Sequence, residues 1–180
     1  MKTFKTLVIL RCPHLVLWAT MRDYLPEFAS RLPEIESVTQ TDRKIGEGGQ
    51  THIVNEWRSS YHLPTSVRSI IGIAGFGWTD RNCWDERTHV CQWTIEPYAM
   101  AEHVLCQGQT KFEPAMAGQG TRVTLEGSLE LKAGFLRKAI AAEAIVAPIL
   151  ESAVATVIPK SLRSTLEAAA TFANQPSKTL

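Results

Sequence analysis

The stretch that decides the fold is residues 25–55, LPEFASRLPEIESVTQTDRKIGEGGQTHIVN. Within it, Leu25–Pro26 and Leu32–Pro33 interrupt a short helical pattern, because a residue that precedes proline avoids the helical region of backbone space. Residues 35–45 and 51–59 follow as strands, and the GEGG segment between them supplies glycines for a tight turn with positive φ. The sequence therefore places two small broken helices directly before a run of β-hairpins.

Strands are also predicted on both sides of this stretch. Residues 4–10 read as the first strand, and Pro13 suits the start of a helix over residues 13–24, where its missing N–H is not needed. Further strands are predicted at residues 78–84, 90–96, 102–112 and 121–131, and residues 62–72 cross between hairpins. The last strand alternates most clearly, which predicts a sheet with one buried face. Its residues on that face are Thr121, Val123, Leu125, Gly127, Leu129 and Leu131.

The period becomes helical over residues 135–174, and Pro148 and Pro159 are expected to kink or divide that helix. The order of elements predicts an α+β fold, a curved antiparallel sheet of about six to seven strands around a long C-terminal helix, with two short helices after the first strand. Residues 1–174 are expected to form one domain, and residues 175–180 a frayed tail.

Composition excludes several classes of protein. The chain has 180 residues, 44% hydrophobic and 21% charged, with a net charge of +1, and it has no basic run of the kind that a general nucleic-acid binder carries. Arg11 and Pro13 split the apolar N-terminus, which favours a strand and a helix over a signal peptide. No stretch is apolar enough to insert stably in a membrane. The four cysteines lack metal spacing, so we expect no metal, and no cofactor is expected either. Three of the cysteines lie in strand patterns, where a free thiol acts as a small hydrophobe, and this indicates a reducing compartment and a cytoplasmic protein.

Three segments carry a resemblance to a known family. They are CPHLVLWATMRDYLPEFASRLPEIESV (12–38), the pair GWTDRNCWD (77–85) and HVCQWTIEP (89–97), and GQGTRVTLEGSLELK (118–132). In this order they resemble the START-like helix-grip superfamily, which includes lipid-transfer domains, pollen-allergen-type ligand binders and polyketide cyclases. The resemblance implies an apolar cavity between sheet and helix, and an apolar small molecule or lipid as partner.

The predicted inward faces of the strands and of the C-terminal helix supply a candidate lining for that cavity. The lining residues are Ile53, Asn55, Trp57, Trp78, Cys91, Trp93, Val104, Val123, Leu125, Leu129, Val154 and Ile158. The tryptophans either stack on a ligand or fill the core, and the sequence leaves both interpretations open. Asn55 and His89 are polar residues on predicted inward faces, so they either orient a ligand or lie hydrated at the rim.

For two arginines and two cysteines the sequence likewise leaves both a functional and a structural interpretation open. Arg58 and Arg81 either bind an anionic head group or lie solvated on the outer face. If residues 97–100 form a four-residue turn, Cys91 pairs with Cys106 and Trp93 with Val104 across neighbouring strands. The two cysteines would then be either a redox or metal pair or simply two small buried residues.

Three functions remain open. The leading interpretation is a non-catalytic binder or carrier of an apolar small molecule or lipid, with an entrance where the short helices, residues 62–69 and the C-terminal helix meet. The second is a cyclase- or aromatase-like enzyme in which His89, Asn55 or Arg81 polarises a carbonyl or moves a proton. The third is an interaction module with a filled core and an exposed apolar stripe over residues 154–166. No local catalytic motif is present, which favours a binder.

Overall fold

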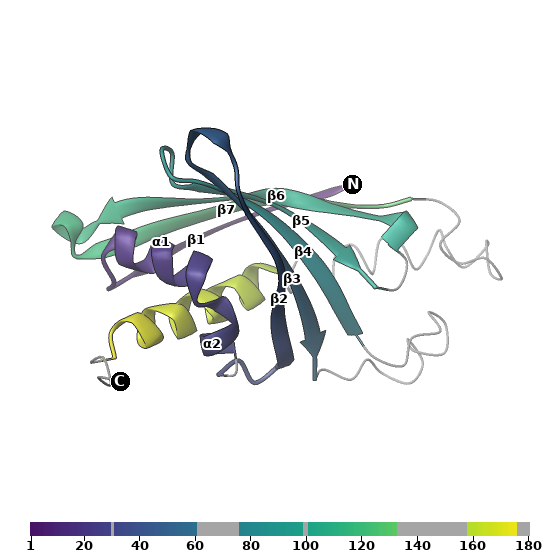
Figure 1. Cartoon of the computed structure of the whole chain (residues 1–180), viewed down its shortest axis with the longest axis horizontal. Helices are drawn as coiled ribbons and strands as arrows, with labels where there is room; N and C mark the ends of the chain where they lie inside the picture. The colour runs from purple at the N-terminus through teal and green to yellow at the C-terminus, as the bar shows by residue number, and fades with distance from the viewer. Residues whose placement is uncertain (30, 61–75, 99–100, 133–157, 176–180) are drawn as a thin grey trace.

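A computed structural model describes residues 1–29, 31–60, 76–98, 101–132 and 158–175 (Figure 1). These residues form one seven-stranded antiparallel sheet in the order β1-β7-β6-β5-β4-β3-β2. The strands are β1 (Lys2–Leu10), β2 (Ile35–Ile45), β3 (Gln50–Ser59), β4 (Phe76–Asp85), β5 (Val90–Pro97), β6 (Val104–Ala115) and β7 (Gly120–Leu131). Register shifts in β2 mark irregular pairing with β3, and the sheet bends strongly along its length (Figure 1). The predicted curved antiparallel sheet is confirmed.

The helices lie together on one side of the sheet (Figure 1). They are α1 (His14–Asp23), α2 (Leu25–Ala29) and a helix described over residues 158–173, which includes Pro159. Three short 3₁₀ turns, η1 (Glu47–Gly49), η2 (Ala101–His103) and η3 (Met116–Gly118), join strands. The rest of the predicted C-terminal helix, with Pro148 and Val154, lies outside the described residues, as do residues 62–72 of the crossing segment.

The local predictions for the opening stretch hold. α2 begins at Leu25, the first Leu-Pro step, and ends at Ala29, before the second step at Leu32–Pro33. In the turn between β2 and β3, Gly48 and Gly49 have φ values of 70° and 84°. A side chain at Gly48 would also collide with the Arg87 guanidinium, since a Cβ there would lie 2.6 Å from Nη2. The turn therefore needs glycine for both its backbone and its neighbour.

The interior contains two apolar clusters. The larger one joins α1 and α2 to the sheet through Leu17, Trp18 and Phe28, which are almost fully buried. The smaller one consists of Phe4, Trp93, Cys106, Leu125 and Leu129. Leu162 of the C-terminal helix packs against both clusters, so this helix covers the junction between them.

The predicted register of β5 and β6 is wrong. Cys91 lies opposite Thr110, Trp93 opposite Gly108, and Cys106 opposite Ile95. The prediction assumed a four-residue turn over residues 97–100, whereas the pairing of the two strands ends at Ile95 and Cys106 and β6 starts at Val104, after η2. The longer connection shifts the pairing along the strands, so Cys91 and Cys106 are not opposite one another.

None of the helices in the described part of the chain is long and apolar enough to cross a membrane.

Candidate functional site

The helix-facing side of the sheet carries the residues that were predicted to line a cavity. Ten of them are buried or half-buried on the sheet: Ile53, Asn55, Trp57, Trp78, Cys91, Trp93, Val104, Val123, Leu125 and Leu129. Ile158 lies on the C-terminal helix and packs against Phe4, Trp93, Cys106, Leu125 and Leu129. Val154 lies outside the described residues. We call this side of the sheet the concave face.

One aromatic wall of the concave face comes from β3 and β4. Trp57 and Trp78 lie opposite one another in the register and their rings are stacked, with centroids 5.4 Å apart and planes at 13°. The Trp57 side chain is 7% exposed, yet its indole Nε1 has no hydrogen-bond partner. The pair therefore offers both an apolar surface and an unused donor.

A second aromatic wall lies across β5, β6 and β7. The Trp93 indole lies over Gly108 and Gly127, where any side chain would overlap its ring, and it stacks on Phe4 at a centroid distance of 6.2 Å. Its Nε1 donates a hydrogen bond to Thr110 Oγ1 at 3.1 Å. The glycines thus let a large ring lie flat on the sheet, which fixes its position.

A polar group separates the two walls in the middle of β3 and β4. Asn55 lies opposite Asp80, and Asn82 shares the inward face of β4 with Asp80. Asn55 is 3% exposed and Asn82 9%, so neither lies at a hydrated rim. The Cys91 thiol donates a hydrogen bond to Asn82 Oδ1 at 3.6 Å, which joins β5 to the group.

Asp80 is the unusual member of this group. Burial raises the pKa of the Asp80 carboxyl above its usual range, and the nearby N–H groups of Asn82, Asn55 and Trp57 only partly oppose that rise. Its Oδ1 atom is shielded from solvent and has no hydrogen-bond partner, and no described cation forms an ion pair with it. Such an atom is costly to bury unless another group bonds to it.

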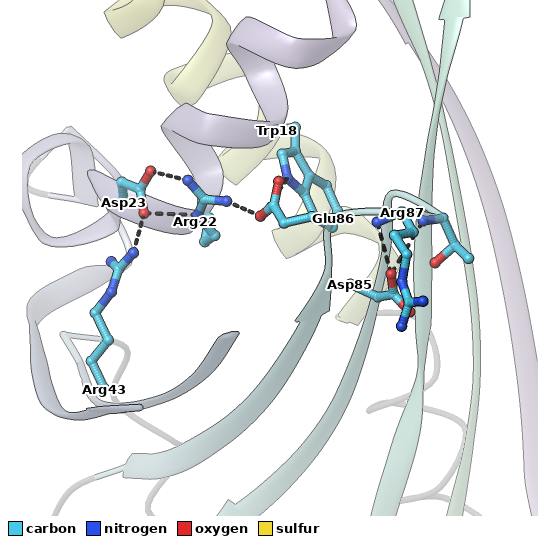
Figure 2. Close-up of polar contacts among 8 residues, drawn as sticks. Trp18, Arg22, Asp23, Arg43, Asp85, Glu86 and Arg87 are labelled. Atoms are coloured by element: carbon cyan, nitrogen blue, oxygen red, sulfur yellow. Dashed lines mark hydrogen bonds and ion pairs between the residues drawn. The ribbon is translucent and has the colours of Figure 1, made fainter. Parts of the chain in front are cut away.

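A network of charged side chains joins α1 to the sheet (Figure 2). Arg22 of α1 bonds to both carboxylate oxygens of Asp23 and forms an ion pair with Glu86, in the turn between β4 and β5. Arg43 of β2 reaches Asp23 Oδ1 at 2.7 Å, and Trp18 Nε1 donates to Glu86 Oε2 at 3.2 Å. The arginine hydrogen bonds lower the pKa of the Asp23 carboxyl. The network therefore holds α1 against β2 and against the turn between β4 and β5.

Two residues that the sequence proposed for the site, His89 and Arg81, do not lie beside the polar group of β3 and β4. His89 does not lie on a strand: it stands in the β4–β5 turn with φ 51°, and its ring packs edge-on against Trp18 and His14. Arg81 lies on the outer face, where it pairs with Glu96 at 3.2 Å. Arg58 is exposed on that same face. The solvated interpretation of both arginines holds.

The cysteines are free thiols rather than a pair. Burial raises the pKa of the Cys106 thiol to about 12 and that of the Cys91 thiol well above its ordinary value. Neither is a redox or metal site by this geometry, because a reactive thiol needs a lowered pKa. No cluster of His, Cys, Asp and Glu in the described ranges is arranged to hold a metal ion.

A groove of about 740 Å³ lies on the opposite, outer face of the sheet. Its walls are mainly polar, including His52, Arg81, Gln92 and Gln109. Most of its lining residues are polar, whereas the concave face carries two aromatic walls, so the concave face is the stronger candidate.

Sequence reasoning missed Asp80. It was not among the candidate residues, although the alternation in WTDRNCW (78–84) places Trp78, Asp80, Asn82 and Trp84 on one face. Trp84 is buried, and a strand that alternates from buried tryptophan through Asn and Asp carries its polar residues inward. That pattern is the signal that was available.

No protein-family model matches the sequence, and no curated protein matches it. Solved structures are similar in fold at low identity. The Zhui aromatase/cyclase from Streptomyces sp. R1128 is 16% identical, with a TM-score of 0.66 over 99% of each chain. Ginseng major latex-like protein 151 from Panax ginseng is 11% identical, with a TM-score of 0.58 over 97% of this chain and 98% of that one.

Norcoclaurine synthase from Thalictrum flavum is 11% identical, with a TM-score of 0.57 over 97% of this chain and 87% of that one. These similarities extend over nearly the whole chain and agree with the curved sheet, the two short helices and the C-terminal helix described above. The chain therefore shares the fold of these structures, the helix-grip fold, in which a curved antiparallel sheet is packed against a C-terminal helix.

Proposed function

We propose that the concave face binds an apolar small molecule or lipid between the sheet and the C-terminal helix. The observation that carries this proposal is the combination of two aromatic walls with a buried polar group whose Asp80 Oδ1 and Trp57 Nε1 lack partners. Large apolar surfaces with a few placed polar atoms are what small-molecule sites consist of. A purely structural core would be expected to satisfy those atoms.

A cyclase-like enzyme is the second candidate, and Asp80 is the specific observation that favours it. Burial raises the pKa of the Asp80 carboxyl, and a carboxyl with a raised pKa in a partly apolar site is the kind of group that serves as a general acid or base. Its neighbour Asn55 was a sequence candidate for the same chemistry, whereas His89 and Arg81 lie elsewhere. Solved structures with this fold include both an aromatase/cyclase and a latex-like protein, so the fold alone does not choose.

The interaction-module interpretation has less support. It requires an exposed apolar stripe over residues 154–166, and in the described part of that range Leu166 is fully buried while Ile158 and Leu162 pack on the core.

The test is titration of the purified protein with naphthalene, followed by calorimetry, after native mass spectrometry has established whether an apolar molecule co-purifies. Trp57→Ala removes part of one wall and should weaken binding by about tenfold, since it deletes aromatic contact area. Arg58→Ala is the matched control, because Arg58 is the next residue on the same strand and points outward. Equal loss in both variants, or no binding by any of them, would refute the proposal.

A further inference from the structure

The unpartnered atoms of the concave face point to the polar chemistry of the ligand. Asp80 Oδ1 is an acceptor and Trp57 Nε1 is a donor, and both are buried without a hydrogen-bond partner. They belong to neighbouring strands, since Asn55 is opposite Asp80 and Trp57 follows two residues later on the same face. The Trp57 N–H lies near enough to the Asp80 carboxyl to oppose the rise in its pKa, although no hydrogen bond of ordinary geometry joins the two atoms.

The surroundings leave these two atoms for a ligand. Trp93 already donates to Thr110, and the Asn82 carbonyl oxygen already accepts from Cys91. Trp84 Nε1 is also buried without a partner, but the Trp84 ring lies farther along β4, against Trp18 and Phe112. Around Asp80 the described neighbours are Asn55, Asn82, Trp57 and Cys91. The adjacent Arg81 points to the outer face, where it pairs with Glu96. A ligand beside the stacked Trp57 and Trp78 rings must therefore donate a hydrogen bond to Asp80 Oδ1 and accept one from Trp57 Nε1.

A hydroxyl group meets this requirement. It can donate its hydrogen to a carboxylate oxygen while its oxygen accepts from an indole N–H. One group then removes the free-energy cost of burying both protein atoms without hydrogen bonds. An ether oxygen can accept from the indole but cannot donate to the carboxylate. An ammonium group can donate but cannot accept. A plain hydrocarbon does neither and leaves both atoms unpaired.

We infer that Asp80 and Trp57 form a hydroxyl-recognition site, and that the ligand of the concave face is an apolar molecule bearing an alcohol or phenol. This inference rests on the proposed function, because it names the ligand class of the same face. Binding removes no atom and transfers no proton: the hydroxyl donates to Asp80 Oδ1 and accepts from Trp57 Nε1. An analogue without the hydroxyl leaves both Asp80 Oδ1 and Trp57 Nε1 without a hydrogen bond, so the site discriminates strongly against it.

The test uses three probes with one apolar body: 2-naphthol, 2-methoxynaphthalene and naphthalene, titrated calorimetrically into the intact protein near neutral pH. We expect 2-naphthol to bind at least tenfold more tightly than either of the other two. Asp80→Leu and, separately, Trp57→Phe should reduce that preference to about twofold while naphthalene still binds. Arg81→Leu, the next residue on β4 but on the outer face, should keep the full preference.

The possible failures are distinguishable. If all three probes bind equally to the unmodified protein, the hydroxyl inference is wrong and the apolar site stands, with water occupying the polar atoms. If 2-naphthol is preferred but Asp80→Leu and Trp57→Phe leave the preference unchanged, the hydroxyl lies elsewhere and the assignment to these residues is wrong. If no probe binds, the proposed function fails and the inference fails with it.

Discussion

At the scale of the residue, Asp80 makes a testable contribution to stability. Its pKa is raised by burial in the folded protein, so the folded state holds its proton to higher pH than the unfolded state does. The stabilising contribution is then complete below the unfolded pKa of about 3.9 and is lost as pH rises through the folded value. Asp80→Asn removes the buried charge, and we expect it to be more stable than the unmodified protein at neutral pH by on the order of 1 kcal/mol.

The difference should shrink towards acid pH, and urea unfolding at a series of pH values measures it. Asp23→Asn is the control of opposite sign, because Arg22 lowers the pKa of Asp23. That variant should lose stability at neutral pH and regain parity as pH falls through the folded pKa. A neutral-pH loss of stability in Asp80→Asn would contradict the account of Asp80.

The thiols give a second prediction at this scale. Because burial raises the pKa of Cys91 and Cys106, the latter to about 12, both should be nearly free of thiolate at about pH 8 and react slowly with iodoacetamide. Cys83 is half-buried and should be modified first. Peptide mass spectrometry over a time course measures the order, and modification of Cys106 as fast as Cys83 would refute it.

At the scale of the element, β7 depends on its glycine. A Cβ at Gly127 would lie 2.6 Å from Trp93 Cη2 and 2.7 Å from Phe4 Cζ. Gly127→Ala should therefore lower the free energy of unfolding by about 2–3 kcal/mol, with a smaller loss when Trp93 is also changed to alanine. Gly118→Ala, at φ 87° with no atom within 4 Å, should cost about 1 kcal/mol in both backgrounds. An equal cost of Gly127→Ala with and without the Trp93 ring would show that the ring is not the obstacle.

The attachment of α1 gives the other prediction for an element. Arg22 joins Asp23 and Glu86 while only 18% of its side chain is exposed, so Arg22→Met should lower the free energy of unfolding by about 1–2 kcal/mol. Hydrogen exchange should then increase in α1 before it increases in the sheet. Lys44→Met, which breaks an exposed pair with Asp42, is the control and should leave exchange in α1 unchanged. Faster exchange across the whole sheet instead of in α1 would contradict this role of the network.

At the scale of the whole molecule, the sequence predicts the elements better than their register. Periodicity and Leu-Pro steps locate the strands and the two short helices, because these are local effects of side-chain alternation and of the proline ring. The pairing of Cys91 was mispredicted because a connection six residues long between Pro97 and Val104 was read as a four-residue turn, and loop length alone sets the register.

The residues of the candidate site were also predictable only where local alternation decides their placement. The inward placement of Asn55 and of Trp57 was predictable from alternation in β3, and the structure agrees. Asp80 was missed because a carboxylate was expected in water, and its burial depends on the neighbouring strands that cover it. His89 was misplaced because a turn with positive φ at a non-glycine residue leaves no pattern in the sequence.

The measurement that tests the central claim most directly is an NMR titration with naphthalene that follows the indole N–H signals of the tryptophans. Binding in the concave face should shift the Trp57 and Trp93 indole signals at low probe concentration. The backbone signals of Gln92 and Gln109, which line the groove on the outer face, should stay in place. Shifts confined to those outer signals, with the indoles unmoved, would contradict the claim that the concave face is the binding site.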